Sequence, residues 1–185
     1  MQNLINYIQQ FVKLQAETID KLNRYSDVEY VEKNELLLEA GQKCNKIWFI
    51  DTGMIRKYYL HDDKELSTWI HTENETFTSL QSYWSQAPSN EYLQACEPCR
   101  LISISRNNSQ KLAACPEINT FTQLLIEKEM VQVEEHTREL RVRDAKDKYA
   151  YFCRIAPEVV RRAKLGHIAS ILGITQETLS RIRKA

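Results

Sequence analysis

The chain has 185 residues, enough for one or two domains with a buried core. Hydrophobic residues make up 43% and charged residues 27%, which is typical of a folded soluble protein, and Lys and Arg balance Asp and Glu at 25 each. No apolar run reaches the roughly 20 residues that a membrane span needs, and residues 1–14 lack the features of a signal peptide. We therefore expect a cytoplasmic protein with no membrane partner.

The first 115 residues change from a helical pattern to a strand pattern. Apolar residues recur at helical spacing over the first two dozen positions, which predicts helix there. Short segments rich in branched and aromatic residues then follow, separated by turn signals such as Gly41 and Gly53. The clearest of these segments are 35–39, 46–50, 54–60, 66–71 and 100–105. Many short strands at fairly even intervals predict a rolled or closed all-β unit.

Two sets of side chains in this β unit allow more than one interpretation. Cys96 and Cys99 have the spacing of a metal or redox pair, but no second close pair or histidine cluster lies nearby, which favours free thiols. Four aromatic residues either line an effector pocket or belong to the core of the β unit, the commoner role for aromatic side chains. These residues are Trp48, Trp69, Tyr83 and Trp84.

A long helix is predicted to begin at Pro116, since proline fits the first turn of a helix. A seam of side chains then repeats at separations of four, three, four and three residues, the 3.5-residue period of a coiled coil. The seam consists of Ile126, Met130, Val133, Thr137 and Leu140. A helix lying along its own β unit is one explanation. We expect residues 116–142 to form a dimerisation helix instead, because an apolar seam would otherwise remain uncovered.

Beyond a predicted helix over residues 144–155 and a short one from Pro157, residues 165–183 have the pattern of two helices joined by a tight turn. Ile168 and Leu172 lie four apart, on one face of the first helix. Gly173 readily adopts the left-handed conformation that ends a helix, and the Thr175 hydroxyl is suited to cap the next one. This is the arrangement of a helix-turn-helix, whose second helix enters a DNA major groove.

The charge distribution supports DNA binding. From Arg138 onward the chain has twelve Lys or Arg against five Asp or Glu, a net charge of +7, so the preceding residues carry −7. Attraction to phosphates therefore belongs to the basic C-terminal part. An ordinary helical hairpin with a solvated charged face would share each feature singly. The combination of turn chemistry and basic charge favours the helix-turn-helix.

This order of elements resembles the cyclic-AMP receptor protein and Fnr (Crp/Fnr) family of bacterial transcription regulators. The most specific stretch is 168–183, which looks like the version in the Bacteroidetes branch, and 39–41, 47–53 and 77–80 match the β unit more loosely. The resemblance implies an α+β fold with an N-terminal double-stranded β-helix, a cupin-like jelly roll of the cyclic nucleotide-binding type. It also implies division into a sensor domain (1–115), a dimer helix (116–142) and a helix-turn-helix domain (143–185).

By the same resemblance, side chains early in the second helix read DNA bases. The residues at these positions are Gln176, Glu177, Ser180 and Arg181. Glutamine can bridge adenine, glutamate can accept from cytosine and arginine can pair with guanine. Phosphate contacts are expected from Thr175, Thr178, Arg183 and Lys184. Because the sequence ends at Ala185, we expect no β-hairpin wing after the motif.

The sensor region departs from the cyclic nucleotide binders of this family, which hold the phosphate with an Arg-Ser or Arg-Thr pair. No arginine occurs from Lys57 to Glu97, and Glu91 would repel a phosphate. We therefore expect no cofactor and an effector other than cyclic AMP. Its candidate pocket residues are Phe77, Ser79, Leu80, Ser89 and Asn90.

A cupin-like metal enzyme is one alternative for the β unit. Such a site needs several histidines around one metal, whereas the four histidines fall in different predicted elements, so we expect neither a metal nor an enzyme. A second alternative is a regulator acting through protein contacts, or an orphan small-molecule-binding roll with weak DNA affinity. The favoured interpretation is a homodimeric regulator that binds double-stranded DNA, responds to an unknown small molecule and has RNA polymerase as a further expected partner.

Overall fold

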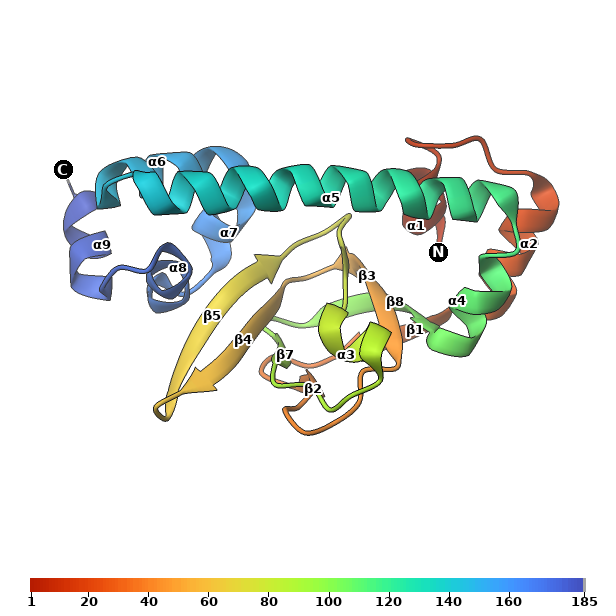
Figure 1. Ribbon diagram of the computed structural model, residues 1–185, viewed down its shortest axis with the longest axis horizontal. Coiled ribbons are helices and arrows are strands. Elements are labelled where there is room, and N and C mark those ends of the chain that lie inside the picture. The colour runs from red at the N-terminus through yellow and green to blue at the C-terminus, as the bar shows by residue number, and fades with distance from the viewer. Residues whose placement is uncertain (185) are drawn as a thin grey trace.

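Two antiparallel sheets form the middle of the protein, which a computed structural model describes over residues 1–184 (Figure 1). The first sheet has the order β1 (Asp27–Val31), β8 (Cys99–Ser105), β3 (Lys46–Thr52) and β6 (Thr76–Phe77). The second has the order β2 (Leu36–Leu38), β7 (Tyr92–Ala95), β4 (Ile55–His61) and β5 (Lys64–His71). Buried side chains from both sheets share one cluster between them. The predicted α+β fold is confirmed, and its β unit is an antiparallel β-sandwich.

The sequence of strand β3 contains an unbroken apolar run because both faces of the strand are buried. Trp48 lies opposite Ser103 of β8, and its ring belongs to the cluster between the sheets. The next residue, Phe49, lies opposite Ile102, and both belong to a second cluster on the outer face of the sheet. Alternate side chains of a strand point to opposite faces, so each face of β3 requires its own apolar set.

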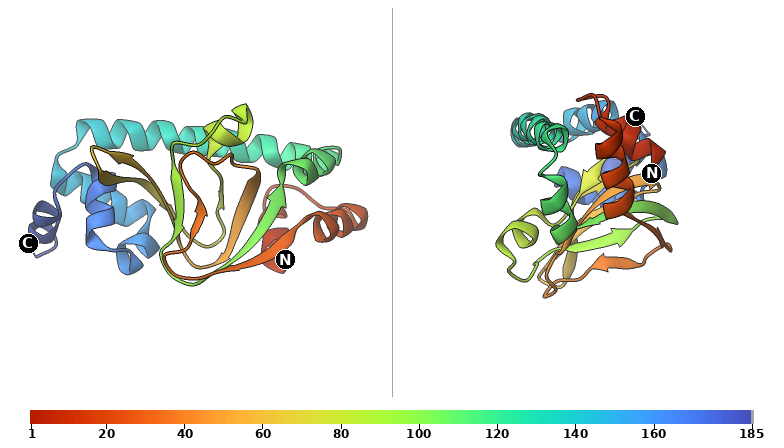
Figure 2. Two further views of the ribbon diagram at one scale, coloured as in Figure 1. Left: turned by 90° about the horizontal axis from the view of Figure 1, so that it is seen from below. Right: turned by 90° about the vertical axis from the view of Figure 1, so that its right-hand side faces the viewer.

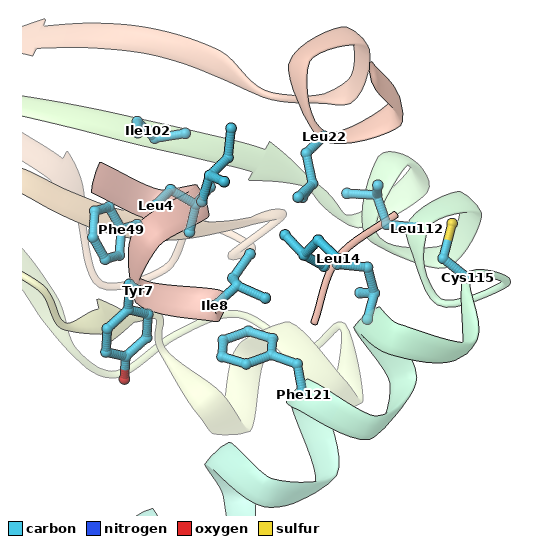
Figure 3. Packing of buried hydrophobic residues seen from close by; sticks show 12 residues of the cluster. Leu4, Tyr7, Ile8, Leu14, Leu22, Phe49, Ile102, Leu112, Cys115 and Phe121 are labelled. Atoms are coloured by element: carbon cyan, nitrogen blue, oxygen red, sulfur yellow. The ribbon is translucent and has the colours of Figure 1, made fainter. Parts of the chain in front are cut away.

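Helices cover that outer face. They are α1 (Gln2–Ile8), α2 (Ala16–Tyr25), α4 (Arg106–Leu112) and the start of α5 (Pro116–Val142). Leu4 and Ile8 of α1, Leu22 of α2 and Phe121 of α5 belong to one buried cluster with Phe49 (Figure 3). The sequence pattern predicted continuous helix over the first two dozen residues. The structure instead has two helices, because the segment between them turns and places Leu14 in the same core.

The long helix begins at Pro116, as predicted, and runs for 27 residues along one side of the sandwich (Figures 1 and 2). Its first turns are buried with the N-terminal helices. Farther along, His136 stacks on Trp69 of β5 with ring centroids 4.9 Å apart. The helix therefore rests on its own β unit along one face. No helix within residues 1–184 has the length and apolar character to cross a membrane.

Four helices at the far end of α5 follow it within residues 1–184. They are α6 (Ala145–Ile155), α7 (Pro157–Arg162), α8 (Leu165–Leu172) and α9 (Gln176–Ile182). Their apolar core includes Phe152, Ile168 and Leu172, and it continues into the sandwich through Met54 and Ile70. The C-terminal helices and the β unit thus share one core in this conformation.

The sequence pattern missed several short elements of the β unit. Strands β1, β6 and β7 and the helices α3 (Leu80–Ser85) and α4 were not identified. Strand β6 has only two residues, too few for an alternating pattern. Helix α3 exposes Leu80 and Trp84 while burying Tyr83, so its apolar residues do not form one stripe.

Candidate nucleic-acid interface

Helices α8 and α9 are joined by a turn that their sequence specifies closely. Gly173 has φ +65°, and no atom would lie within 4 Å of an added Cβ, so glycine serves the backbone conformation there. The N–H of Ile174 donates to the carbonyl of Ala169 at 3.0 Å, the six-to-one bond of a Schellman motif. The turn therefore satisfies the carbonyls of Ala169 and Ser170 and directs the chain into α9.

Helix α9 begins with the predicted cap and buries one side. The Thr178 N–H donates to the Thr175 hydroxyl at 3.1 Å. Leu179 is fully buried, in the cluster that contains Ile168 and Leu172 of α8. One buried leucine anchors this helix of only two turns, so Gln176, Glu177 and Arg181 remain exposed. Helix α9 lies at one end of the molecule (Figure 1).

The structure brings all the predicted DNA-contacting residues together at this end of the chain. Six of them are exposed: Thr175, Gln176, Glu177, Arg181, Arg183 and Lys184. Thr178 and Ser180 are half-buried. The Gln176 side chain lies across the start of α8, since a Cβ added to Gly166 would meet its Oε1 at 2.9 Å. Hydrogen bonds from its own backbone N–H and from the Thr175 hydroxyl lower the pKa of Glu177, which keeps that carboxylate ionised.

The basic charge of this region is only partly neutralised within the chain. Arg143 pairs with Glu139, and Arg161 pairs with Glu158. By contrast, Arg181, Arg183 and Lys184 form no ion pair with any side chain of residues 1–184. These three cations extend from the last turn of α9 and are available to a polyanion.

On the inner side of α8, His167 faces the β4–β5 hairpin. Burial, together with the charges of Arg56 and Lys164, lowers the pKa of His167 to about 4, while Glu65 acts weakly in the opposite direction. Its Nδ1 is buried without a hydrogen-bond partner among residues 1–184. At a pH between the lowered pKa and the ordinary pKa of histidine, the imidazole is therefore neutral in the folded protein and protonated in the unfolded chain.

We expect this histidine to make folding sensitive to mild acid. Between about pH 6.5 and pH 4 the unfolded chain binds a proton that the folded chain does not, so the unfolding free energy falls as the pH is lowered. Allowing for partial exposure of the ring, the loss should be about 1–2 kcal/mol. Urea unfolding at pH 6.5 and pH 4.5 measures it. His167→Gln should reduce the difference, with the remainder coming in part from His136, whose pKa burial also lowers. His61→Gln, at an exposed imidazole, should retain the full difference.

Along α5 the predicted dimer seam is largely exposed. Ile126 is 46% exposed, Met130 68% and Val133 61%, and Thr137 is also exposed. Leu140 instead is half-buried and packs against the core of the C-terminal helices. Four of the five seam residues thus form an uncovered stripe, and the fifth contributes to folding of the chain itself.

The residues predicted to line an effector pocket differ in their exposure. Phe77 is buried and stacks on Trp48, whereas Leu80 and Asn90 lie on the surface. Ser79 and Ser89 are buried with their hydroxyls 3.1 Å apart. The hydroxyl of Ser79 also donates to the Glu91 carboxylate at 2.8 Å.

A carboxylate of the chain itself therefore occupies this region. Glu91 accepts from Ser79 and lies 3.8 Å from the ammonium group of Lys57. An incoming phosphate would have to displace this carboxylate from both partners. A pocket of about 410 Å³ lies beside this region, and Glu29, Lys46 and Trp48 form part of its wall. Gln42 also lines this pocket, and its carbonyl accepts from the N–H of Ser89 at 2.8 Å.

Cys96 and Cys99 are free thiols in the structure. Burial raises the pKa of Cys96 to about 11 and also raises the pKa of Cys99. Both side chains are therefore protonated near neutral pH, whereas metal ligation requires the thiolate. The Cys99 sulfur lies against Gly53, where an added Cβ would meet it at 2.5 Å, so this thiol has a packing role.

Comparison with known proteins places this geometry in a family context. Residues 28–114 match the family model of the cyclic nucleotide-binding domain. No curated protein sequence matches the chain significantly. FixK2 from Bradyrhizobium japonicum is similar in structure, with 20% identity, a TM-score of 0.71, and coverage of 86% of this chain and 83% of that chain.

Two further solved structures cover nearly the whole chain. The c-di-GMP responsive global regulator CLP from Xanthomonas campestris has 16% identity and a TM-score of 0.70, covering 92% of this chain and 90% of that one. A Crp/Fnr-family regulator from Eubacterium rectale has 14% identity and a TM-score of 0.69, covering 97% and 86%. At these identities the likeness establishes the fold. Together with the domain match, it confirms the predicted resemblance to the Crp/Fnr family.

Proposed function

We propose that the chain is a sequence-specific DNA-binding transcription regulator that acts as a homodimer. The observation that carries this proposal is the outward-facing side of α9, whose exposed polar and basic residues follow a glycine turn and a threonine cap. A short helix held by one buried leucine and flanked by unpaired cations suits a DNA major groove. The fold shared with FixK2 and CLP supports the same function.

In the proposed complex, α8 and α9 form a helix-turn-helix with α9 as the recognition helix. Its base contacts come from Gln176, Glu177 and Arg181, which are exposed, and from Ser180, which is half-buried. The contacts with phosphates come from Thr175, Thr178, Arg183 and Lys184. Residues 1–115, 116–142 and 143–185 then act as the sensor, dimer helix and DNA-binding domain, although the first and last share a core in this conformation.

The exposed stripe of α5 supports the homodimer. Met130 and Val133 lie about one turn apart, next to Ile126, and no residue among 1–184 covers them. Two copies of the stripe packed as a coiled coil would bury these side chains and relate the two α9 helices by a two-fold axis. The dimer would then read two half-sites about 34–36 Å apart, one turn of DNA.

Fluorescence anisotropy with labelled duplex DNA tests the DNA-binding function. The wild-type protein should bind DNA with an affinity that falls steeply as the salt concentration rises, because bound phosphates release their counterions. Specific sites should compete more strongly than bulk DNA. Salt-independent binding, or no binding at low salt, would contradict the proposal and favour a regulator that acts through protein contacts.

We expect the β unit not to bind cyclic AMP in the micromolar range. The Glu91 carboxylate already accepts from Ser79 and faces Lys57, and the segment from Lys57 to Glu97 has no arginine to pair with a phosphate. Isothermal calorimetry of the wild-type protein should therefore show no saturable heat. A micromolar dissociation constant would contradict this expectation, and any effector would then be sought among cyclic nucleotides rather than other small molecules.

A further inference from the structure

One arginine connects the C-terminal helices to two loops of the sandwich. The guanidinium group of Arg162, in the last turn of α7, donates to both carboxylate oxygens of Glu73 at 2.9 and 2.8 Å. Its Nη1 also lies 3.5 Å from Glu97, in the loop between β7 and β8. The Arg162 side chain is only 19% exposed. A bidentate, mostly buried ion pair of this kind fixes the relative orientation of the two side chains as well as the distance between them.

The sandwich holds Glu73 in place from the other side. The backbone N–H of Gly53 donates to the same carboxylate at 2.9 Å. Although burial opposes ionisation, the hydrogen bonds from Arg162 and Gly53 hold the pKa of Glu73 at about 2. The carboxylate is therefore charged throughout the physiological range. It is attached to the helix by two hydrogen bonds and to the β3–β4 turn by one.

A second polar contact crosses the same boundary. Strand β5 has a bulge opposite Lys57 and Tyr58, where Thr68 is left without a partner in the ladder. Beside this bulge, the N–H of Ser67 donates to the Ser170 hydroxyl of α8 at 2.9 Å. Met54 and Ile70 contribute the apolar part of the boundary, in one cluster with Ile168. Helix α8 thus packs on β5, and α7 forms an ion pair with the loop that follows β5.

The position of Glu73 connects this boundary to the sensor region. Its loop runs directly into β6 and then to Ser79, and it is fixed to β3 by hydrogen bonds of 3.0 Å between Ile50 and both Asn74 and Glu75. On the helical side, Arg162 lies three residues before Leu165, where α8 begins. A displacement of the loop would therefore reach α8 and α9 through one ion pair, without passing along α5.

We propose that Arg162 and Glu73 form a positioning contact that sets the orientation of α8 and α9 relative to the sandwich. The pair couples movements of the segment 72–91 to the DNA-binding surface by a route separate from the long helix. Arg162 acts through Glu73 and does not contact DNA. The DNA part of this inference rests on the proposed function, whereas the structural part stands without it.

Hydrogen exchange measured by mass spectrometry tests the structural part. Arg162→Ala should speed amide exchange at least tenfold in peptides covering residues 66–72 and 165–172, because α8 packs less stably on β5. The matched control is Arg161→Ala, which removes an equal charge from the same helix but only an exposed pair with Glu158. Glu73→Gln should reproduce the effect of Arg162→Ala with a smaller structural change. Exchange as slow as in the control, in both variants, would overturn the proposal.

Anisotropy with a specific DNA site tests the coupling. Arg162→Ala and Glu73→Gln should each weaken specific binding about tenfold, because α9 is no longer held in one orientation, while Arg161→Ala should stay within twofold of the wild type. Glu73 lies on the sandwich, so its substitution separates positioning from a direct phosphate contact by Arg162. A loss confined to Arg162→Ala would overturn the positioning role. If exchange accelerates as expected and even the wild-type protein binds no DNA, the proposed function fails and the structural coupling remains.

Discussion

Replacing Met130 and Val133 together with glutamate is expected to convert the protein from a dimer to a monomer and to weaken specific DNA binding at least a hundredfold. Both side chains are more than half exposed in the single chain, so the substitutions should leave its fold intact. In the dimer they would bury two unpaired charges on each copy, which costs several kcal/mol. The monomer would then lose the gain from binding two half-sites at once, which is on the order of 100-fold or more.

Sedimentation velocity and DNA anisotropy on the same samples measure both effects. The control is Val131→Glu, because Val131 is 65% exposed on the same helix but lies about 100° around it from Met130. This variant should remain a dimer with wild-type DNA affinity. A dimeric Met130→Glu, Val133→Glu double variant would show that the exposed stripe is not the contact between copies.

Arg181→Ala is expected to cost about 1–3 kcal/mol of specific binding and to relax the choice of base at one position of each half-site. Arg181 is exposed on α9 and forms no ion pair with residues 1–184, so its guanidinium group is available to a guanine. Lys184→Ala, at a predicted phosphate contact, should instead weaken binding equally to every sequence. It should also reduce the salt dependence by about one counterion.

Anisotropy against a panel of single-base variants of one site separates the two residues. If Arg181→Ala lowers affinity for every duplex by the same factor, the residue contacts phosphate and the assignment of α9 as the base-reading element loses its main support. A uniform loss for Lys184→Ala confirms its phosphate role, while a base-dependent loss would exchange the two assignments.

The parts of the fold that local sequence determines were predicted well. Gly173 and Thr175 act within one or two turns of chain, so their roles at the α8–α9 turn could be inferred from spacing alone. Pro116 marked the start of α5 for the same reason. The strand pattern identified β3 and β8 because they are long and apolar, but it missed the two-residue β6.

Contacts between distant residues were beyond the reach of periodicity. Arg162 and Glu73 are 89 residues apart, and Ser67 and Ser170 are 103 apart. Each looks like an ordinary polar surface residue in the sequence, and only the docking of α7 and α8 on the sandwich brings the pairs together. Leu140 shows the same limit on α5, since its spacing matched the exposed seam while its side chain packs into the C-terminal core.

The most direct test of the central claim is selection of binding sites from a pool of random duplex DNA, followed by sequencing. Two symmetry-related α9 helices should enrich an inverted repeat whose half-sites have centres about 10 base pairs apart. Repeating the selection with Arg181→Ala should lose one base preference in each half-site. A pool that remains unenriched, or a motif without two-fold symmetry, would contradict the account of a dimer reading DNA through paired α9 helices.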